Sequence, residues 1–273
     1  ADLTRDQHRT KVMAMIGSSI GLVFALSMVA APLLYAAVGM DGIFWLTAVL
    51  AAGAIGVLLW AVPVAPPVPR ATGRLIDVLR DGQLMRLNFG VFALHLIQTP
   101  MWVMVPSALV SGGGLPMPEH WKVYLPAVLL SFVVMVPAVI VAERRDKLKP
   151  VFNAAIVLLA IVQIGLWLFG DGLIPLALLL TLFFISFNVL EATQPSWISR
   201  IAPPGSKGTA LGVYNTLQSI GLFLGGVLGG WLGQTFGPAA VSLSCAALAL
   251  LWLALASTMN PPPLRAAPAG APR

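Results

Sequence analysis

Charged residues are scarce in this sequence. Of its 273 residues, 10% are Asp, Glu, Lys or Arg, whereas 58% are hydrophobic. The mean hydropathy is +0.90. A soluble core of this size cannot hide so much apolar surface, whereas a lipid bilayer accommodates it, because each membrane-crossing helix needs about 20 mostly apolar residues. The composition therefore excludes a soluble globular protein and predicts a membrane protein.

Cysteine is nearly absent, and so are clusters of ligating side chains. Cys245 is the single cysteine, which excludes an intrachain disulfide. Glu119 and His120 have no second histidine at helical spacing, so we expect no metal site. An enzyme of this kind should show His, Asp or Glu gathered at one membrane face, and the sequence shows no such cluster. We therefore expect neither an enzyme nor a bound cofactor.

What the sequence has instead is eight long apolar runs separated by short polar breaks. They predict an all-α, polytopic membrane protein with eight transmembrane helices. The predicted spans are residues 12–38, 43–62, 87–110, 124–142, 151–170, 173–198, 210–231 and 239–259.

The positions of the Lys and Arg residues give the orientation. Of the 16, 15 lie in every second break, and the other breaks contain only Lys122. Because Lys and Arg beside membrane spans are retained in the cytoplasm, both chain ends are predicted to be cytoplasmic. The net charge of +6 is divided among these loops and forms no patch with exposed aromatic side chains. We therefore expect the lipid bilayer, and no nucleic acid, as a partner.

A short repeat indicates two related halves. Ser19-Ile20-Gly21-Leu22 recurs as Ser219-Ile220-Gly221-Leu222, and each copy follows a basic segment and opens a glycine-rich span. Parallel repeats of this kind are typical of some secondary transporters. If each half has six helices, residues 1–62 are the last two helices of the first bundle and residues 87–260 are the second bundle. Residues 63–86 are then an inter-domain linker, and 261–273 a disordered tail rich in Pro and Ala.

Several motifs resemble one known family. They are Asp2-Leu3-Thr4-Arg5 through Arg9-Thr10-Lys11, Asn188-Val189-Leu190-Glu191-Ala192, and Gly208-Thr209-Ala210-Leu211-Gly212-Val213-Tyr214. In these the chain resembles the major facilitator superfamily, in particular its drug:proton antiporter branch. The resemblance implies a twelve-helix fold of which this chain holds helices 5–12, the first four being absent.

The same resemblance implies a bacterial inner-membrane exporter of a small hydrophobic or amphipathic, drug-like solute. Its partners would be the solute, protons and the four missing helices, and a proton gradient would supply the energy without a cofactor. One departure leaves alternatives open. Family antiporters carry paired glycines after the proline of the fifth helix, whereas this chain has Pro32-Leu33-Leu34. A facilitator, a proton symporter, or a non-transporting sensor or scaffold therefore stays possible.

Glu191 is the one acidic residue predicted inside a span. Nine residues separate it from Arg200, so it lies roughly 13 Å from the cytoplasmic end of its helix. A carboxylate at this depth is costly unless it is paired, hydrated or protonated, and such residues mark ion or proton paths. Glu191 is therefore our candidate for proton coupling. The alternative is a structural pairing with a cytoplasmic cation.

Other polar or aromatic residues inside the spans are candidates for a solute pathway between the two halves. Interhelical hydrogen bonding explains most of them about as well. The candidates are His95, Gln98, Trp102, Gln163, Asn188, Gln194, Asn215 and Gln218.

Two further groups concern packing and gating. Small residues at four-residue spacing let helices approach closely, and a proline within a helix permits a kink. This predicts packing roles for Gly17, Gly21, Pro32, Gly221, Gly225, Gly229 and Gly233. By resemblance to the family's acidic–basic loop motif, charge contacts that close the cytoplasmic side are expected of Asp2, Arg9, Glu143, Arg144 and Arg145.

Overall fold

The computed structural model describes residues 6–63, 74–203 and 205–261. All regular structure in these ranges is helical, as the sequence predicts. The chain divides into two compact units, Ala1–Arg70 and Ala71–Arg273, which are described separately below. The boundary falls within the predicted linker, residues 63–86. The predicted tail lies outside the described residues except for its first position.

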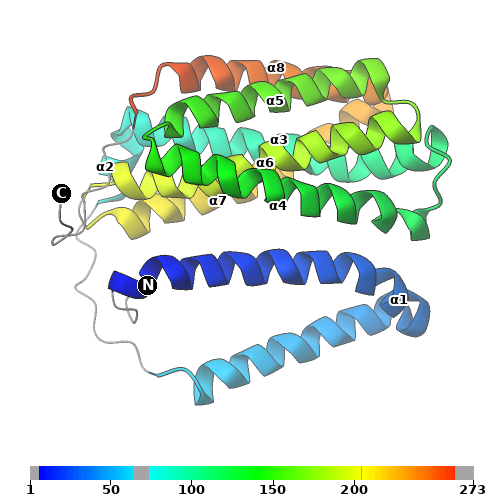
Figure 1. Ribbon diagram of the computed structural model, residues 1–273, viewed down its shortest axis with the longest axis horizontal. Helices are drawn as coiled ribbons and strands as arrows, with labels where there is room; N and C mark the ends of the chain where they lie inside the picture. Colours follow the sequence, from blue (N-terminus) through cyan, green and yellow to red (C-terminus); the bar gives the residue numbers. More distant parts are fainter. Residues whose placement is uncertain (1–5, 64–73, 204, 262–273) are drawn as a thin grey trace. The chain divides into compact units, whose positions relative to one another are not determined.

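The first unit contains one long helical element, α1 (Asp6–Trp60), with a break at Gly39. Gly39 has φ 68° and ψ −174°, a backbone conformation that is essentially restricted to glycine. It divides α1 into two helical arms, which form the hairpin drawn in blue and cyan in Figure 1. The arms correspond to the first two predicted spans, and Pro32 lies inside the first of them.

The second unit is a bundle of six long helices accompanied by two short ones (Figure 1). Its elements are α2 (Leu75–Arg80), α3 (Gly82–Ser111), η1 (Met117–Glu119), α4 (Trp121–Arg144), α5 (Leu148–Phe169), α6 (Leu173–Ile201), α7 (Lys207–Phe236) and α8 (Pro238–Ser257). The six long helices coincide with the six predicted spans to within a few residues.

The largest difference between the predicted spans and the observed helices lies at the start of the bundle. The predicted linker contains helix α2, and α3 begins at Gly82, five residues before the predicted span. Asp81 caps α3, because its Oδ1 accepts hydrogen bonds from the backbone N–H groups of Gln83 and Leu84 at 2.8 and 3.1 Å. A side-chain cap of this kind satisfies amides that the helix itself leaves free.

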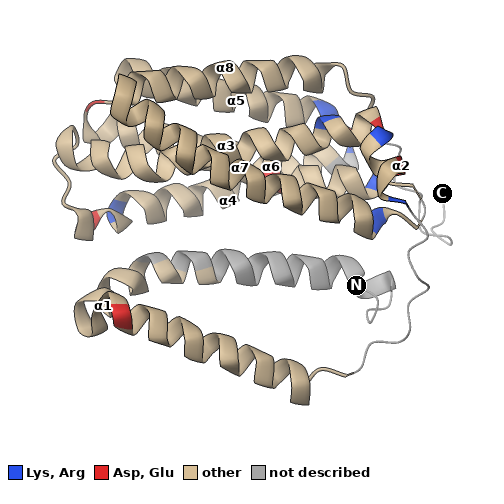
Figure 2. Cartoon of the chain, turned by 180° about the vertical axis from the view of Figure 1, so that it is seen from behind, with Lys and Arg blue, Asp and Glu red and all other residues tan. Residues whose placement is uncertain are grey.

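Seven of the described helical stretches are long and apolar enough to cross a membrane. The first, Val29–Trp60, contains the break at Gly39. Lys and Arg of the second unit gather at the ends of its helices, and the middle of the bundle is nearly free of charge (Figure 2). The prediction of an all-α, polytopic membrane fold is confirmed.

Helices α7 and α8 are joined by a single residue, Gly237, which ends one helix and caps the next. Its φ of 83° and ψ of 174° nearly repeat the values at Gly39. The two copies of the sequence repeat therefore lie in two helical hairpins with the same glycine corner.

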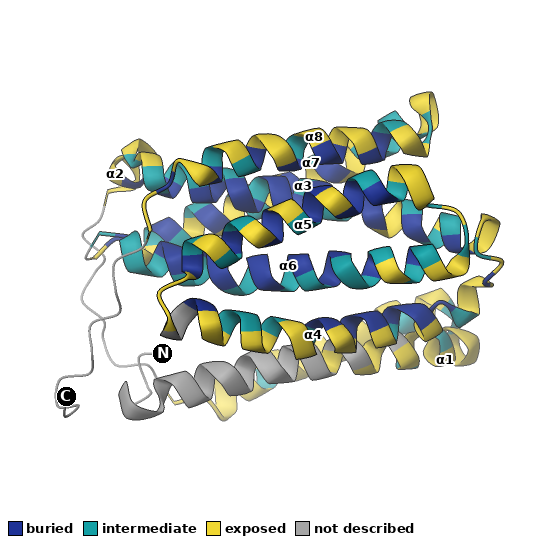
Figure 3. Ribbon diagram, turned by 45° about the horizontal axis from the view of Figure 1, so that its top comes forward, coloured by how far each residue is buried: buried dark blue, intermediate teal, exposed yellow. Residues whose placement is uncertain are grey.

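Buried residues lie mainly on the helix faces that point into the six-helix bundle, and exposed residues on the outer faces (Figure 3). One aromatic cluster joins α5, α6 and α8, because the ring of Phe152 lies edge-on to Trp197 and Trp252 at centroid distances of 5.2 and 5.8 Å. All three rings are fully buried. This packing fixes α6, which carries one residue of the site described next, against α5 and α8.

Candidate functional site

The most unusual group of side chains lies where α3, α6 and α7 meet. His95 of α3 is buried, and its Nε2 lies 3.4 Å from Oε1 of Glu191 on α6. The same Nε2 lies 2.8 Å from the side-chain nitrogen of Gln218 on α7. The other ring nitrogen, Nδ1, lies 2.9 Å from the backbone oxygen of Val91. The structure thus brings three of the predicted site residues into one polar cluster, which we call the His95 cluster.

Glycines explain how α7 comes so close to α3. A Cβ atom added at Gly221 would lie 2.5 Å from the backbone oxygen of Phe92, and one at Gly225 would lie 2.7 Å from that of Leu96. At Gly229 it would lie 2.5 Å from the ring of Pro100. The contacts recur every four residues on both helices, so the two run in the same direction with their backbones nearly touching.

A hydroxyl reinforces this contact beside the His95 cluster. Thr99 Oγ1 donates to the backbone oxygen of His95 at 3.0 Å and to that of Leu222 on α7 at 3.2 Å. Gln218 precedes Leu222 by one helical turn. The close approach of the helix backbones therefore places the Gln218 amide against the imidazole.

The Glu191 side chain is partly exposed, whereas its neighbour His95 is buried. Its side chain is 31% exposed, whereas that of His95 is 4% exposed. Oε1 is buried and accepts no hydrogen bond from the residues that the structure describes. The Tyr214 hydroxyl of α7 is likewise buried without a hydrogen-bond partner in the described part. The titratable side chain nearest to Glu191 is therefore that of His95, which forms an ion pair with the carboxylate only when the imidazole is protonated.

The other predicted pathway residues are distributed along the bundle. Asn188 shares a helix face with Glu191 and donates to Ser131 Oγ of α4 at 2.7 Å. Gln163 is buried and donates to the sulfur of Met101 at 3.5 Å. Gln98 is half-buried one turn beyond His95.

Two further amide side chains stand apart from this group. Gln194 is buried, and both polar atoms of its amide lack hydrogen bonds among the described residues. Asn215 is exposed on α7. No hydrogen bond within the described ranges joins either residue, or Gln98 and Gln163, to the His95 cluster.

A run of aromatic rings extends from the His95 cluster to Tyr124, near the start of α4. Phe187 packs edge-on against His95 with centroids 5.8 Å apart, and it stacks on Phe183 at 5.9 Å. Phe183 contacts Phe184, whose ring lies 6.1 Å from that of Trp102. Trp102, predicted as a pathway residue, is 39% exposed and stacks on Tyr124 of α4 at 5.8 Å.

Most of the gating and packing residues predicted in the first unit have side chains that the structure does not describe. Asp2 lies outside the described residues, and Arg9, Gly17 and Gly21 belong to the part of α1 whose side chains are not described.

In the second unit, the side chains of Glu143 and Arg144 are likewise not described, and Arg145 is exposed beyond the end of α4. Gly233 leaves ordinary van der Waals space, because an added Cβ would lie 3.6 Å from Val241.

Two polar side chains, Lys149 and Tyr214, are not among the residues predicted from the sequence. Lys149 Nζ donates to the backbone oxygens of Ser257 and Met259 at 2.8 and 2.6 Å, and so ties the start of α5 to the end of α8. Tyr214 was noted only as part of a family motif, although its position four residues before Gln218 places both on one face of α7. That spacing was the available signal.

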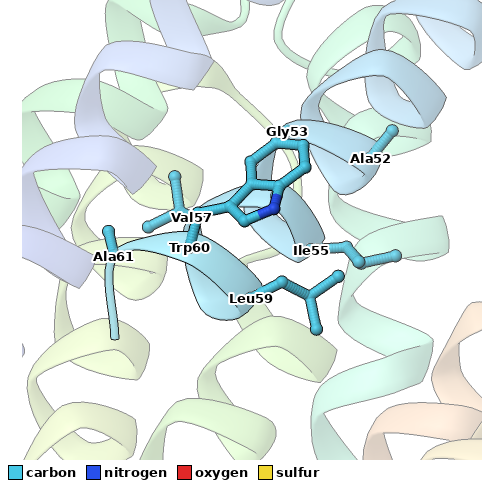
Figure 4. Close-up of a pocket in the computed structure, with 8 residues that line it drawn as sticks. Ala52, Gly53, Ile55, Val57, Leu59, Trp60 and Ala61 are labelled. Carbon is cyan, nitrogen blue, oxygen red and sulfur yellow. The ribbon is translucent and has the colours of Figure 1, made fainter. Parts of the chain in front are cut away.

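A shallow depression on α1 offers no comparable chemistry. Figure 4 shows its lining, from Ala52 to Ala61, which comes from the last turns of α1 and the residue that follows them and contains no titratable side chain. It arises where the Trp60 ring lies over Gly56, 3.1 Å from the position of a Cβ there. Within the described ranges no three His, Cys, Asp or Glu side chains gather as a metal site would require.

Comparison with known proteins points to one family. The family model described as Major Facilitator Superfamily matches residues 1–226 and 127–273. The chain is 41% identical over 269 residues to "Inner membrane transport protein YajR" of Escherichia coli strain K12, covering 96% of this chain and 59% of that protein.

Two more distant relatives carry transport-related names. An "Uncharacterized transporter" of Buchnera aphidicola subsp. Acyrthosiphon pisum is 28% identical, covering 82% of this chain and 59% of the relative. "Multidrug resistance protein MdtH" of Aeromonas hydrophila is 25% identical, covering 60% and 39%. The chain thus spans about three fifths of the length of the first two relatives.

Proposed function

Because the chain belongs to the major facilitator superfamily, we propose that it forms part of a secondary transporter that exports a small hydrophobic or amphipathic solute in exchange for protons. The names of YajR, a transport protein, and MdtH, a multidrug resistance protein, support this proposal. The chain is an integral membrane protein by family and by its apolar helices. We further propose a bacterial inner membrane with both chain ends in the cytoplasm, and energy from the proton gradient without a cofactor.

The observation that carries the proposal is the pair formed by His95 and Glu191. These two titratable side chains lie 3.4 Å apart on two different helices. The next charged residues on those helices, Arg86 and Arg200, are nine positions away from them in sequence. Titratable side chains inside membrane helices are costly, and they are typical of proton paths in transporters.

The charge balance of this pair links proton binding to solute binding. With one proton bound, the pair is either an imidazolium beside a carboxylate or two neutral groups, so its net charge is zero. When the proton leaves, one negative charge remains in a largely apolar bundle. That charge must be compensated by water or a polar solute group, because an unpaired buried charge is strongly unfavourable. Release of the proton and entry of solute therefore favour one another.

The pathway residues act around this pair in the proposed cycle. Asn188 supplies a polar group on the helix face of Glu191, Gln98 supplies a half-buried amide one turn beyond His95, and the exposed ring of Trp102 supplies an apolar surface. Pockets that bind drug-like solutes combine mostly apolar walls with a few polar anchors. Alternating access would expose the pair to one side of the membrane at a time.

The test uses the complete gene product in proteoliposomes with an imposed pH gradient. Internal pH is followed while lipophilic drugs are added to wild type, Glu191→Gln and a matched control, Glu119→Gln. Glu119 is a surface carboxylate that pairs with Lys122 at 2.7 Å. We expect solute-dependent proton movement in wild type and in the control, and at least a tenfold loss in Glu191→Gln.

Two results would contradict the proposal. Full coupling in Glu191→Gln would assign the carboxylate a structural role. Solute flux without proton movement in wild type would identify a facilitator of the same fold.

A further inference from the structure

Three polar atoms face the two ring nitrogens of the buried His95 imidazole, so the ring cannot form hydrogen bonds with all of them at once. Val91 contributes a backbone oxygen at Nδ1, while Gln218 and Glu191 both face Nε2. Phe187 closes the ring's edge. How the protons are divided among these partners follows from which atoms can donate and which can accept.

Nδ1 has a fixed role. A backbone oxygen can only accept a hydrogen bond, so the 2.9 Å contact with Val91 requires a proton on Nδ1. The neutral ring is therefore the tautomer with Nδ1 protonated, and Nε2 is left with a lone pair. All proton exchange of the ring then takes place at Nε2.

Nε2 can satisfy only one of its two neighbours in each state. Without a proton it accepts from the Gln218 side-chain N–H at 2.8 Å. With a proton it donates to Glu191 Oε1, which has no other hydrogen-bond partner among the described residues. The Gln218 N–H would then point at another N–H, so the amide must turn over or withdraw.

We propose that Gln218 is a positioning residue that holds His95 unprotonated at Nε2 and releases the ring to Glu191 when a proton arrives. The inference deepens the proposed function, on which it rests for its role in transport. Gln218 lies on the α7 face that contacts α3 through Gly221 and Gly225. The amide therefore turns beside the close backbone contact between α3 and α7, which connects the arrival of the proton to a change in packing.

Few other titratable groups can compete for this proton. Of the helices packed around His95, α6 contributes Glu191 and α7 contributes Tyr214, and Cys245 is the titratable side chain of α8. The basic residues of α3, α6 and α7 are Arg86, Arg200 and Lys207, each at least nine positions from the cluster residue on its own helix. The state of Nε2 is therefore set by Gln218 and Glu191.

The test reads the imidazole directly by nitrogen-15 NMR of the complete gene product labelled at histidine, in lipid nanodiscs at one near-neutral pH. This sequence contains three histidines, and the spectrum of His95→Asn assigns the signal. We expect wild-type His95 to be neutral with its proton on Nδ1. In Gln218→Met, which cannot donate to Nε2, the charged fraction should rise about two- to tenfold, the value of one hydrogen bond.

Two more variants make the result specific. Thr216→Val, at an exposed position on the same helix, should leave the His95 signal unchanged. Gln218→Glu keeps the side-chain shape but replaces the amide donor by a carboxylate, so it should raise the charged fraction even where Gln218→Met fails to fold. A wild-type ring protonated on Nε2 alone, or an unchanged His95 signal in both Gln218 variants, would overturn the proposal.

Failure of this proposal and failure of the proposed function give different results. The NMR signal reports on His95 whether or not the protein transports. A shifted signal in the Gln218 variants together with full coupling in Glu191→Gln would keep the positioning role and reject proton coupling through the pair. An unchanged signal in the Gln218 variants together with lost coupling in Glu191→Gln would keep proton coupling through Glu191 and reject the positioning role of Gln218.

Discussion

Replacement of Gly221 by alanine tests whether the contact between α3 and α7 sets the geometry of the His95 cluster. The added Cβ would lie 2.5 Å from the backbone oxygen of Phe92. Carbon–oxygen contacts of this kind need about 3.3 Å, so α7 must withdraw by roughly 0.8 Å. The obstacle is backbone, and a rotamer change cannot relieve it.

Two opposing terms decide the magnitude. Overpacking of a tight contact costs about 1–3 kcal/mol, whereas alanine gains about 1 kcal/mol over glycine inside a helix. We expect a net loss of up to about 2 kcal/mol in the free energy of unfolding relative to wild type, and of about 1–3 kcal/mol relative to a glycine-to-alanine change without the contact. The withdrawal would also lengthen the 2.8 Å contact between Gln218 and His95 to roughly 3.6 Å, beyond hydrogen-bond range. Solute-dependent proton movement should therefore change as well.

The measurement is unfolding of the purified protein followed by tryptophan fluorescence, paired with the liposome assay. Gly230→Ala is the matched control, because nothing lies within 4 Å of its added Cβ. That variant should be unchanged or slightly stabilised. If Gly221→Ala is as stable as Gly230→Ala, the reasoning from backbone contact is refuted.

Two other predictions concern packing away from the His95 cluster. Lys149→Met removes the hydrogen bonds to Ser257 and Met259, so we expect amide exchange in the last turn of α8 to accelerate about fivefold, which corresponds to about 1 kcal/mol. Lys147→Met, at an exposed position, is the control. Equal exchange rates in the two variants would contradict the prediction. Gly90→Ala places a Cβ 2.7 Å from the Trp252 ring nitrogen, so its free energy of unfolding should lie about 1–3 kcal/mol below that of Gly230→Ala, which gains the same helix propensity without the contact. Unchanged stability in a thermal melt would show that Trp252 can move aside.

The fold could be predicted from sequence because membrane spans are marked by composition. Apolar runs predict every long helix of the second unit, and the breaks predicted after residues 38 and 231 contain the two hairpin corners, Gly39 and Gly237. Helix α2 was not predicted, since Pro and Arg dominate its surroundings and hydropathy carries no signal for a short helix outside the membrane. The start of α3 was placed late for a similar reason, because its cap depends on Asp81 rather than on apolar residues.

The site was only partly predictable. Glu191 stands out in sequence because carboxylates are rare in membrane spans. His95 and Gln218 were candidates for a solute pathway, but their contact with each other and with Glu191 depends on the rotation and axial register of three helices. Those are set by interhelical contacts such as the one between Gly221 and Phe92. Hydropathy does not encode such contacts.

The glycine corners at Gly39 and Gly237 have a consequence for how the protein is made. Each joins two membrane helices through one residue. No loop therefore separates the insertion of the first helix from that of the second. The first helix of each hairpin cannot settle in the bilayer before the second has begun to enter. We therefore expect each pair to be inserted as one unit during synthesis, with the direction of the second helix already fixed by the first.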